Sequence, residues 1–542
     1  MQTGKLPVLL FCSLVMLGCG QQKKNSDPER PNIVIIMADD MGYSDIGCYG
    51  GEIHTPNLDH LAAEGIRFTQ FYNCARCCPT RASLMTGMYQ HRVGLARNGQ
   101  NLSQEVPTLA EVLQENGYST GMAGKWHLSR TQAVRPASEQ LKWMAHQVDY
   151  GPFAPPETYP SSRGFEEHWG VIWGVVNYFD PFSLVHNQEP ITEVPADFYI
   201  TDFITDKSVE LIDRFSGKEK PFFLYVAHTA PHWPLHALPE DLERYQGAYE
   251  GGWEKLRTDR YSRQLEMGLL DTVHYLLPEN SSGKTWAECE EKETEANHME
   301  AHAAMVDRLD QGVGRIIRKL EEKGELDNTL ILFLADNGAS YERGYPPGFD
   351  RPGFTRDGTP IDYEPAEPGP ETTWGYLGSA WASAANTPWR YWKKESFEGG
   401  IHTPLVVCWP GGLKGKEGTL NHGVGHVMDI LPTCLQVAGI DYPDVFRGNQ
   451  LSRPDGKSMI PLINGEVSAT SDTLYWEHEG GRAIRIGNWK IAALEGGPWE
   501  LFDLSKDRTE VHDLSGIYPE RVSKMNAAWE EWAVQMGVLE RE

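Results

Sequence analysis

Three apolar runs constrain the fold of this chain more than any other feature. Residues 32–38, 221–227 and 329–335 are almost continuously apolar and rich in β-branched or aromatic side chains. A half-buried strand would alternate polar and apolar residues, so unbroken runs of this length predict strands that are covered on both faces. A further apolar run opens with Pro404, at the first position, where a strand tolerates proline.

Helical patterns separate these runs. They occupy residues 55–65, 108–115, 201–215 and 305–320. The first pattern begins with Thr55 as N-cap and Pro56 at the first helical position, and it stops at Gly65. Strands that alternate with helices predict an α/β fold, a doubly wound mixed sheet flanked by helices.

The pattern changes near residues 440–465. Short strands follow within residues 475–493 and at 501–504, and then an amphipathic helix at about 519–536. We therefore predict a large α/β domain at residues 31–465 and a smaller α+β subdomain with an antiparallel sheet at residues 466–542.

Three long stretches, residues 131–165, 237–300 and 340–390, fit no core element. Loops of that length are usually lids or walls of a binding site. The acidic run at 288–300 is most simply a solvated helix face. The region from 131 to 390 is also rich in aromatic residues, which could either stack on sugar rings or pack in the core: Trp143, Trp169, Trp173, Trp374, Trp381 and Trp389.

The N-terminus has the pattern of an export signal at residues 1–19. Lys5 precedes an apolar run that is too short to span a bilayer. Residues 16–19 resemble a lipobox with Cys19 as the lipidated residue, and residues 20–30 would then be a polar tether. An ordinary cleaved signal peptide is the alternative. Either way we expect an exported protein, in the bacterial periplasm or as an outer-membrane lipoprotein, attached to a membrane only through a lipid at Cys19.

Charge and cysteine content exclude some classes of function. The formal net charge of −27 argues against binding to nucleic acid or to an anionic membrane surface. An anionic substrate would need a local pocket of cations. Nine cysteines are scattered through 542 residues, so we predict no disulfide framework.

Residues 77–87 carry the most specific motif, C-x-P-x-R-x-x-x-x-T-G. Pro79 suits the first turn of a helix that runs to Gly87. The N-terminal dipole of that helix would favour an anion beside Cys77. Arg81 offers a planar, permanently charged fork for the oxygens of such an anion.

This motif resembles the signature of the type I sulfatases in the alkaline phosphatase superfamily. The resemblance implies that a maturase oxidises Cys77 to formylglycine, whose hydrated aldehyde is the nucleophile. One hydroxyl would attack sulfur, and the other would later expel sulfate as the aldehyde re-forms. Thr80 stands where the family more often has Ser. Cys74 and Cys78 are close by, but only Cys77 has Pro at +2 and Arg at +4.

Acidic pairs follow two of the predicted strands. Asp39 and Asp40 come directly after the first, and Asp336 and Asn337 come after the third. Because ligands collect at the carboxyl ends of strands in such sheets, these oxygen ligands predict a site for a hard cation such as Ca²⁺ rather than zinc. Each pair alone could equally be a helix cap or a turn. The sulfatase resemblance implies that they bind one calcium ion together with the modified Cys77.

Two further motifs supply candidate acid–base groups. Lys125 and His127 belong to a Gly-Lys-Trp-His segment after a short predicted strand at 120–123. The resemblance implies that Lys125 contacts sulfate and that His127 is the base. It implies that His232, in the segment Pro-His-Trp-Pro, is the general acid. His228 and His236 compete with His232 for that role.

A last cation precedes a Glu-Gly-Gly segment. Lys393 stands five residues before Glu398, a spacing at which the family's lysine binds sulfate, and the adjacent Lys394 is an alternative. Together with Arg81 and Lys125, this lysine would stabilise the charge of the transition state.

The sequence therefore predicts a sulfuric ester hydrolase that acts on a sulfate monoester, with a sulfated carbohydrate as the favoured substrate. One alternative is a phosphohydrolase of the same superfamily, although those enzymes use a Ser or Thr nucleophile and metal sites richer in His. The other alternative is a non-catalytic lipoprotein that binds sulfated glycans, if Cys77 is never oxidised.

Overall fold

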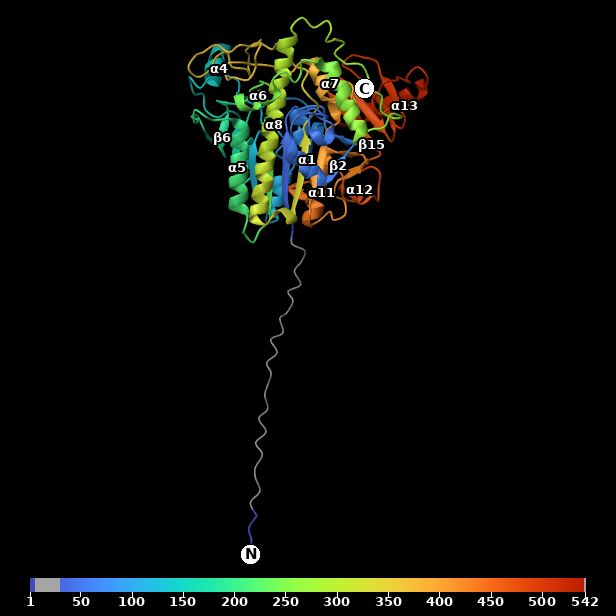
Figure 1. Ribbon diagram of the computed structural model, residues 1–542. Coiled ribbons are helices and arrows are strands. Elements are labelled where there is room, and N and C mark those ends of the chain that lie inside the picture. The colour runs from blue at the N-terminus through green and yellow to red at the C-terminus, as the bar shows by residue number, and fades with distance from the viewer. Residues whose placement is uncertain (5–29, 541–542) are drawn as a thin grey trace.

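The computed structural model describes residues 1–4 and 30–540. Cys19, the predicted tether up to residue 29 and all but the first four residues of the predicted export signal lie outside the described residues. Figure 1 shows a central sheet with helices on both faces, and the C-terminal part of the chain packed at one side. The predicted α/β fold class, a mixed sheet flanked by helices with an antiparallel C-terminal sheet, is confirmed.

Within the described residues the main sheet has ten strands in the order β11-β2-β10-β9-β1-β8-β4-β5-β6-β7. The central strands, from β9 to β5, are parallel, whereas β10 and β6 run antiparallel to their neighbours β9 and β5. Their bounds are β1 Asn32–Ala38, β2 Ile66–Phe68, β4 Ser119–Gly124, β5 Glu167–Val171, β6 Leu184–His186, β7 Glu189–Pro190, β8 Phe222–Ala227, β9 Thr329–Ala335, β10 Leu405–Cys408 and β11 Thr419–Asn421.

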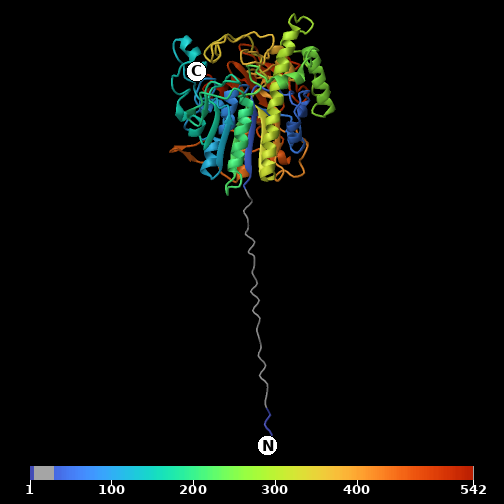
Figure 2. The same ribbon diagram turned by 60° about the vertical axis from the view of Figure 1, so that its left-hand side comes forward.

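Alternate residues of β1 enter two different cores. Val34 and Ile36 face one layer of helices, whereas Ile33 and Ile35 face the other. Because both faces are covered, every residue of β1 is buried, which explains the unbroken apolar run. The first layer contains α1 Pro56–Ala63, α5 Ile200–Phe215 and α8 Lys292–Lys323; the second contains α2 Cys77–Thr86, α3 Leu109–Glu115 and α11 Ile430–Ala438. Figures 1 and 2 show α5 and α8 side by side along the sheet.

The stretches that fit no core element in the sequence, residues 131–165, 237–300 and 340–390, are not loops throughout. Part of each stretch is helical, in α4 Ala137–Met144, α6 Pro239–Tyr245, α7 Gly252–Glu266 and α9 Ser379–Ala385. The helix predicted at 305–320 is only the second half of α8. The acidic run therefore enters this helix, where Ala296 and Met299 are already buried, and only its beginning is solvated.

A second sheet follows the main one. It is antiparallel and contains β15 Thr473–His478, β16 Gly481–Ile486, β17 Trp489–Ala493 and β18 Glu500–Asp503. The helix α13 (Pro519–Gln535) packs on it through Trp529 and Trp532. The same apolar cluster includes Tyr72 and Phe397, so this sheet is packed directly against the segments that carry Cys77 and Lys393.

Within residues 30–540 every cysteine is a free thiol. In the same part of the chain no helix combines the length and the apolar character that crossing a bilayer requires.

A buried ion network fixes the loop that follows β1. The Asp45 carboxylate accepts hydrogen bonds from the backbone N–H of Gly42 (2.8 Å) and from Arg260 Nη1 (2.7 Å), and it pairs with His302 Nε2 (2.9 Å). Burial opposes ionisation, but His302 and Arg260 outweigh it and lower the pKa of Asp45 to about 2. The network stabilises the fold fully above about pH 4, the ordinary pKa of Asp, and the stabilisation is lost as the pH falls through 2.

Asp45→Asn should lower the free energy of unfolding at pH 7 by about 1.5–3 kcal/mol, because it weakens the charge-assisted hydrogen bonds to Arg260 and His302, while Glu52 still pairs with Arg260. Chemical denaturation measures the loss. Asp259→Asn, which breaks the exposed Lys255–Asp259 pair, is the matched control and should change stability by less than about 1 kcal/mol. Equal effects of the two substitutions would contradict the structural role of Asp45.

Candidate active site

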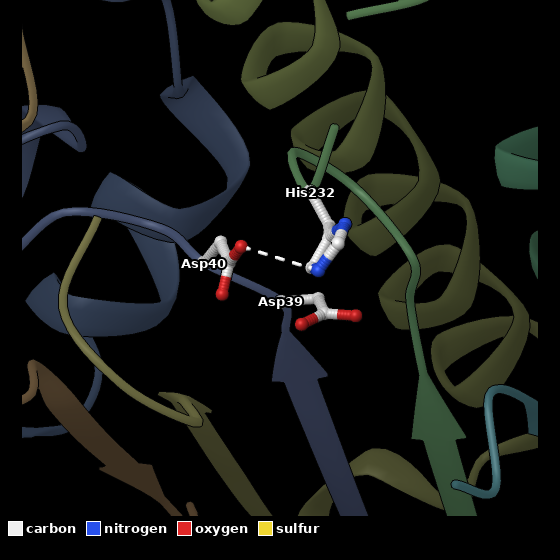
Figure 3. Close-up of side chains that lie close together, drawn as sticks. All are labelled: Asp39, Asp40 and His232. Atoms are coloured by element: carbon white, nitrogen blue, oxygen red, sulfur yellow. Dashed lines mark ion pairs between the residues drawn. The ribbon is translucent and has the colours of Figure 1, made fainter. Parts of the chain in front are cut away.

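Four strands of the main sheet deliver polar side chains to one edge. Asp39 and Asp40 follow β1, Lys125 follows β4, His232 follows β8 and Asp336 follows β9. These strands are parallel neighbours, so their carboxyl ends meet at the same edge. Figure 3 shows Asp39 and Asp40 at the tip of β1, facing His232 from the loop after β8.

The backbone at these strand ends has unusual conformations. Asp40 has a φ of 63°, in the left-handed region that Asp tolerates better than most residues. Gly124 has a φ of 113°, and a Cβ there would lie 1.9 Å from the carbonyl oxygen of Ala227. Glycine at 124 thus lets β4 approach β8 closely enough for the N–H of Lys125 to bond the same oxygen (2.8 Å).

Cys77 is the first residue of α2 and is buried. Its Sγ lies 3.4 Å from Nδ1 of His127, a residue that also has a left-handed φ of 57°. The imidazole also packs closely on Gly174, where a Cβ would lie 2.3 Å from the ring. The helix start and Gly174 therefore hold the His127 ring against the sulfur atom.

Arg81 lies one turn further along α2 and is completely buried. Its Nε and Nη2 both donate to Asp336 Oδ2, at 3.1 and 2.8 Å, and Nη1 donates to the carbonyl of Lys125 at 3.0 Å. Asp39 Oδ2 lies 3.6 Å from Nη2. The guanidinium thus joins the ends of β1, β4 and β9.

The two lysines each pair with one member of the first acidic pair. Lys125 Nζ bonds Asp39 Oδ2, and Lys393 Nζ lies 2.7 Å from Asp40 Oδ2. The amide Nδ2 of Asn337 donates to Asp40 Oδ1 (2.7 Å). The structure therefore brings together all of the sequence-predicted site residues: Asp39, Asp40, Cys77, Arg81, Lys125, His127, His232, Asp336, Asn337 and Lys393.

Burial and neighbouring charges set the ionisation of these groups. Burial, reinforced by Asp336, raises the pKa of Asp39. Burial also acts on Asp40, but His232 and Lys393 outweigh it and lower the pKa of that carboxyl. Burial lowers the pKa of His232 to about 4, and burial together with Lys125 lowers the pKa of His127 well below its usual value. Both imidazoles are neutral at pH 7.

Two buried oxygens in this site are suited to a cation. Asp39 Oδ1 and Asn337 Oδ1 accept no hydrogen bond within the described residues. Ligand atoms of Asp39, Asp40 and His232 also lie within 4.8 Å of one another. Unpartnered buried oxygens are costly, and a hard divalent cation would satisfy them. The donor set therefore fits a metal ion at the acidic edge.

The structure separates the alternatives that the sequence leaves open. His232 Nε2 lies 3.4 Å from Asp40 Oδ2 and 3.3 Å from Lys393 Nζ. The ring of His236 instead bonds the backbone, with the N–H of Tyr178 at 3.2 Å and the Thr373 carbonyl at 2.7 Å. His228 is buried, and its ring nitrogens have no partner within residues 30–540. Of these histidines, His232 is the one in the cluster.

Lys393, and not Lys394, points into the site. Lys394 Nζ pairs with Glu495 on the C-terminal sheet region at 3.1 Å. The two lysines diverge because Lys394 has a left-handed φ of 84°, and its N–H bonds the carbonyl of Ala75.

Sequence analysis missed Glu342 and Arg76. Glu342 Oε2 accepts from Lys393 Nζ (3.2 Å) and from the indole N–H of Trp233 (2.7 Å), while Oε1 pairs with Arg76 (3.0 Å). Arg76 directly precedes Cys77, so its proximity to the motif was a usable signal. Glu342 stands in a Gly- and Pro-rich loop and belongs to no motif, so only the structure identifies it.

The structure decides between sugar stacking and core packing for most of the aromatic residues between 131 and 390. Five of the six are almost fully buried in the cores: Trp143, Trp173, Trp374, Trp381 and Trp389. The sixth, Trp169, stacks on His186 at 3.6 Å. Their size and apolar surface make them packing residues, which the sequence alone does not distinguish from ligand contacts.

The comparisons with known proteins agree with this geometry. A family model described as Sulfatase matches residues 31–440, and one described as N-sulphoglucosamine sulphohydrolase, C-terminal, matches residues 388–526. An uncharacterized sulfatase of Schizosaccharomyces pombe is 34% identical and aligns with 95% of this chain and 96% of its own length. An arylsulfatase of Klebsiella aerogenes is 31% identical over 82% of this chain and 93% of its own.

Among solved structures, that of Ps i-CgsB in complex with k-i-k-neocarrahexaose is similar, with a TM-score of 0.64 and 26% identity. The alignment covers 93% of this chain and 92% of that one. The chain therefore belongs to the sulfatase family, in the alkaline phosphatase superfamily, and is a sulfuric ester hydrolase.

Gly174→Ala should lower kcat about 100-fold, because the added methyl group displaces the His127 ring from Cys77, and a shift of about 1 Å in an active site has effects of this size. Turnover of an aryl sulfate measures the loss. Gly516→Ala is the matched control, since a Cβ there meets no atom within 4 Å. Unchanged kcat in Gly174→Ala would show that the position of His127 does not matter.

Proposed function

We propose that this enzyme hydrolyses a sulfate monoester of a carbohydrate, with hydrated formylglycine formed from Cys77 as nucleophile and one calcium ion as cofactor. The convergence of Cys77, three cations and the acidic strand ends at one sheet edge is the observation that carries the proposal. A formylglycine-generating maturase would supply the oxidised side chain.

The state of the Cys77 thiol supports a modified nucleophile. Burial raises its pKa, although Lys125 and Lys393 oppose the shift. A neutral thiol is a weak nucleophile, and the reactive form of cysteine is the thiolate. A hydrated aldehyde at the same position would place its hydroxyls beside the His127 ring, which is neutral and therefore able to take a proton.

The charges of the site suit a sulfate ester. Three carboxylates, of Asp39, Asp40 and Asp336, face three cations, of Arg81, Lys125 and Lys393, so the protein groups nearly cancel. A bound divalent cation would leave an excess of about two positive charges, by simple addition. An anionic sulfate group and the charge that develops on its oxygens would be stabilised there.

We assign the chain's own groups as follows. Arg81, Lys125 and Lys393 orient the sulfate oxygens. His127 accepts the proton of the second hydroxyl as sulfate leaves, and His232 donates a proton to the departing alcohol. His232 is neutral in the free site, but an anionic ester beside it would raise its pKa toward that required of an acid.

The metal would be held by Asp39, Asp40, Asp336, Asn337 and the modified Cys77, and it would supply charge neutralisation for the sulfate oxygens. The unpartnered oxygens of Asp39 and Asn337 support this assignment. Arg81, which binds Asp336 Oδ2, keeps that carboxylate in place, so its role includes the orientation of a metal ligand.

A sulfated sugar is the proposed substrate class because the similar structure of Ps i-CgsB is a complex with a neocarrahexaose. An exported enzyme, anchored through Cys19 or free in the periplasm, would meet such glycans at the cell envelope. A panel of sugars with sulfate at defined positions would identify the substrate.

Cys77→Ala should reduce turnover of an aryl sulfate to background while the thermal midpoint of unfolding stays within a few degrees of wild type, because the fold does not depend on the nucleophile. Mass spectrometry of the wild-type peptide around residues 77–81, after coexpression with a maturase, should show the lighter aldehyde form.

Cys78→Ala is the control, because it removes the adjacent thiol and should leave turnover intact. An unmodified thiol at Cys77 in a fully active enzyme would contradict the proposal.

Chelation should inactivate the enzyme, and Ca²⁺ should restore it, because hard oxygen ligands dominate the site. Asn337→Ala should raise the Ca²⁺ concentration needed for half-maximal activity about 10-fold or more, within the range that loss of a metal-orienting group produces. Titration of the chelated enzyme measures both effects. Recovery with Zn²⁺ alone would favour the phosphohydrolase alternative.

A further inference from the structure

A buried ion cluster connects the C-terminal sheet to the segment that carries Lys393. Lys490 on β17 is completely buried, with Nζ 2.8 Å from Glu398 Oε1 and 2.7 Å from Glu510 Oε1. Glu398 begins the short helix α10 (Glu398–Ile401), five residues after Lys393. A charged group from the C-terminal region therefore reaches the base of the loop whose lysine faces Asp40.

Glu510 forms hydrogen bonds to both ends of the loop at residues 390–398. Its carboxylate oxygen Oε2 accepts the backbone N–H of Glu398 at 2.8 Å, and its carbonyl accepts Arg390 Nη1 at 2.5 Å. Lys393 lies between these two anchor points. Glu510 itself has a left-handed φ of 60°, a conformation that costs a non-glycine residue free energy and persists only where the surroundings hold it.

Close packing within the loop connects these two anchor points to Lys393. A Cβ at Gly399 would lie 2.2 Å from the carbonyl oxygen of Tyr391, and one at Gly400 would lie 2.0 Å from that of Glu395. The loop is thus folded tightly on the Glu-Gly-Gly turn, which explains why these glycines follow Glu398. The N–H of Lys393 bonds the carbonyl of Ala339 (3.1 Å), directly beside the turn after β9.

The same cluster also reaches the segment before Cys77. The hydroxyl of Tyr72, five residues before Cys77, donates to Glu398 Oε2 at 2.9 Å. Arg485 Nη1 on β16 donates to that hydroxyl at 2.7 Å. Glu398 is therefore shared between the C-terminal sheet and the strand that leads to the nucleophile.

The energetics favour a role in positioning over one in stability alone. A buried ion pair stabilises a fold little, if at all, compared with apolar residues of the same size, because both charges are desolvated. Here two carboxylates compete for one ammonium group. Burial raises the pKa of Glu510 to about 7, whereas Lys490 and His402 hold that of Glu398 well below its usual value. What the cluster provides is one fixed geometry for the loop.

We propose that Lys490 and Glu510 are positioning residues that hold the amino group of Lys393 against Asp40, so that the C-terminal sheet acts on sulfate ester hydrolysis through Lys393. The proposal rests on the role proposed above for Lys393. It predicts that changes at Lys490 matter only while Lys393 is present.

A double-mutant cycle tests this coupling. Lys490→Met should lower kcat/KM for an aryl sulfate about 100-fold in the wild-type background, the size expected for a misplaced charged group. In the Lys393→Ala background, the same substitution should lower kcat/KM less than about 2-fold, because the group it positions is already absent. Lys506→Met, at a lysine that is 81% exposed on the same sheet region, is the control and should have no effect in either background.

Denaturation of each variant separates positioning from folding. Glu510→Gln keeps an acceptor for the N–H of Glu398 and changes shape least, so it repeats the test if Lys490→Met does not fold. Equal losses of kcat/KM in both backgrounds would overturn the positioning proposal alone. Full activity of Lys393→Ala would instead overturn the role of Lys393 in the proposed function.

Discussion

The mutual neutralisation of buried charges at the carboxyl ends of the strands is the interaction on which the site depends. Asp39, Asp40 and Asp336 lie in this interior against Arg81, Lys125 and Lys393, and a buried charge without such a partner would be very costly. The sheet makes this possible, since parallel neighbours bring all the strand ends to one edge. The parallel order of the strands therefore both builds the central sheet and brings the charged side chains of the site together.

Much of the site could be predicted because its residues directly follow apolar strands or belong to a dense motif. Asp39, Lys125 and Asp336 each come within one or two residues of a strand end, so the order of the strands alone places them together. Lys393 was selected because the resemblance to sulfatases gives a meaning to its spacing from Glu398. In the structure, tight packing around Gly399 explains this spacing.

Other features could not be predicted because they depend on contacts between distant segments. Glu342 and Lys490 reach the neighbourhood of Lys393 from a loop without a motif and from a separate sheet. The helices α6 and α7 escaped prediction because aromatic residues such as Tyr245 and Trp253 bury their faces instead of a regular aliphatic repeat. The buried tryptophans could not be interpreted from the sequence either, because composition does not distinguish a tryptophan that packs in the core from one that stacks on a sugar ring.

Backbone strain around the site explains why so much of the molecule is rigidly packed there. Asp40, Ala75, His127 and Lys394 all have positive φ values, and each lies in or beside a group that faces Cys77 or the acidic edge. Such conformations persist only if surrounding contacts exclude relaxed alternatives. Backbone contacts at Gly124, Gly338 and Gly399 leave no room for a Cβ, so the strand ends and turns are locked against each other. The cations of the site already pair with its carboxylates, as Lys393 does with Asp40 at 2.7 Å. The stiff backbone therefore fixes which pairs form and where each cation lies, and cations held in place in advance can stabilise a sulfate group without reorganisation.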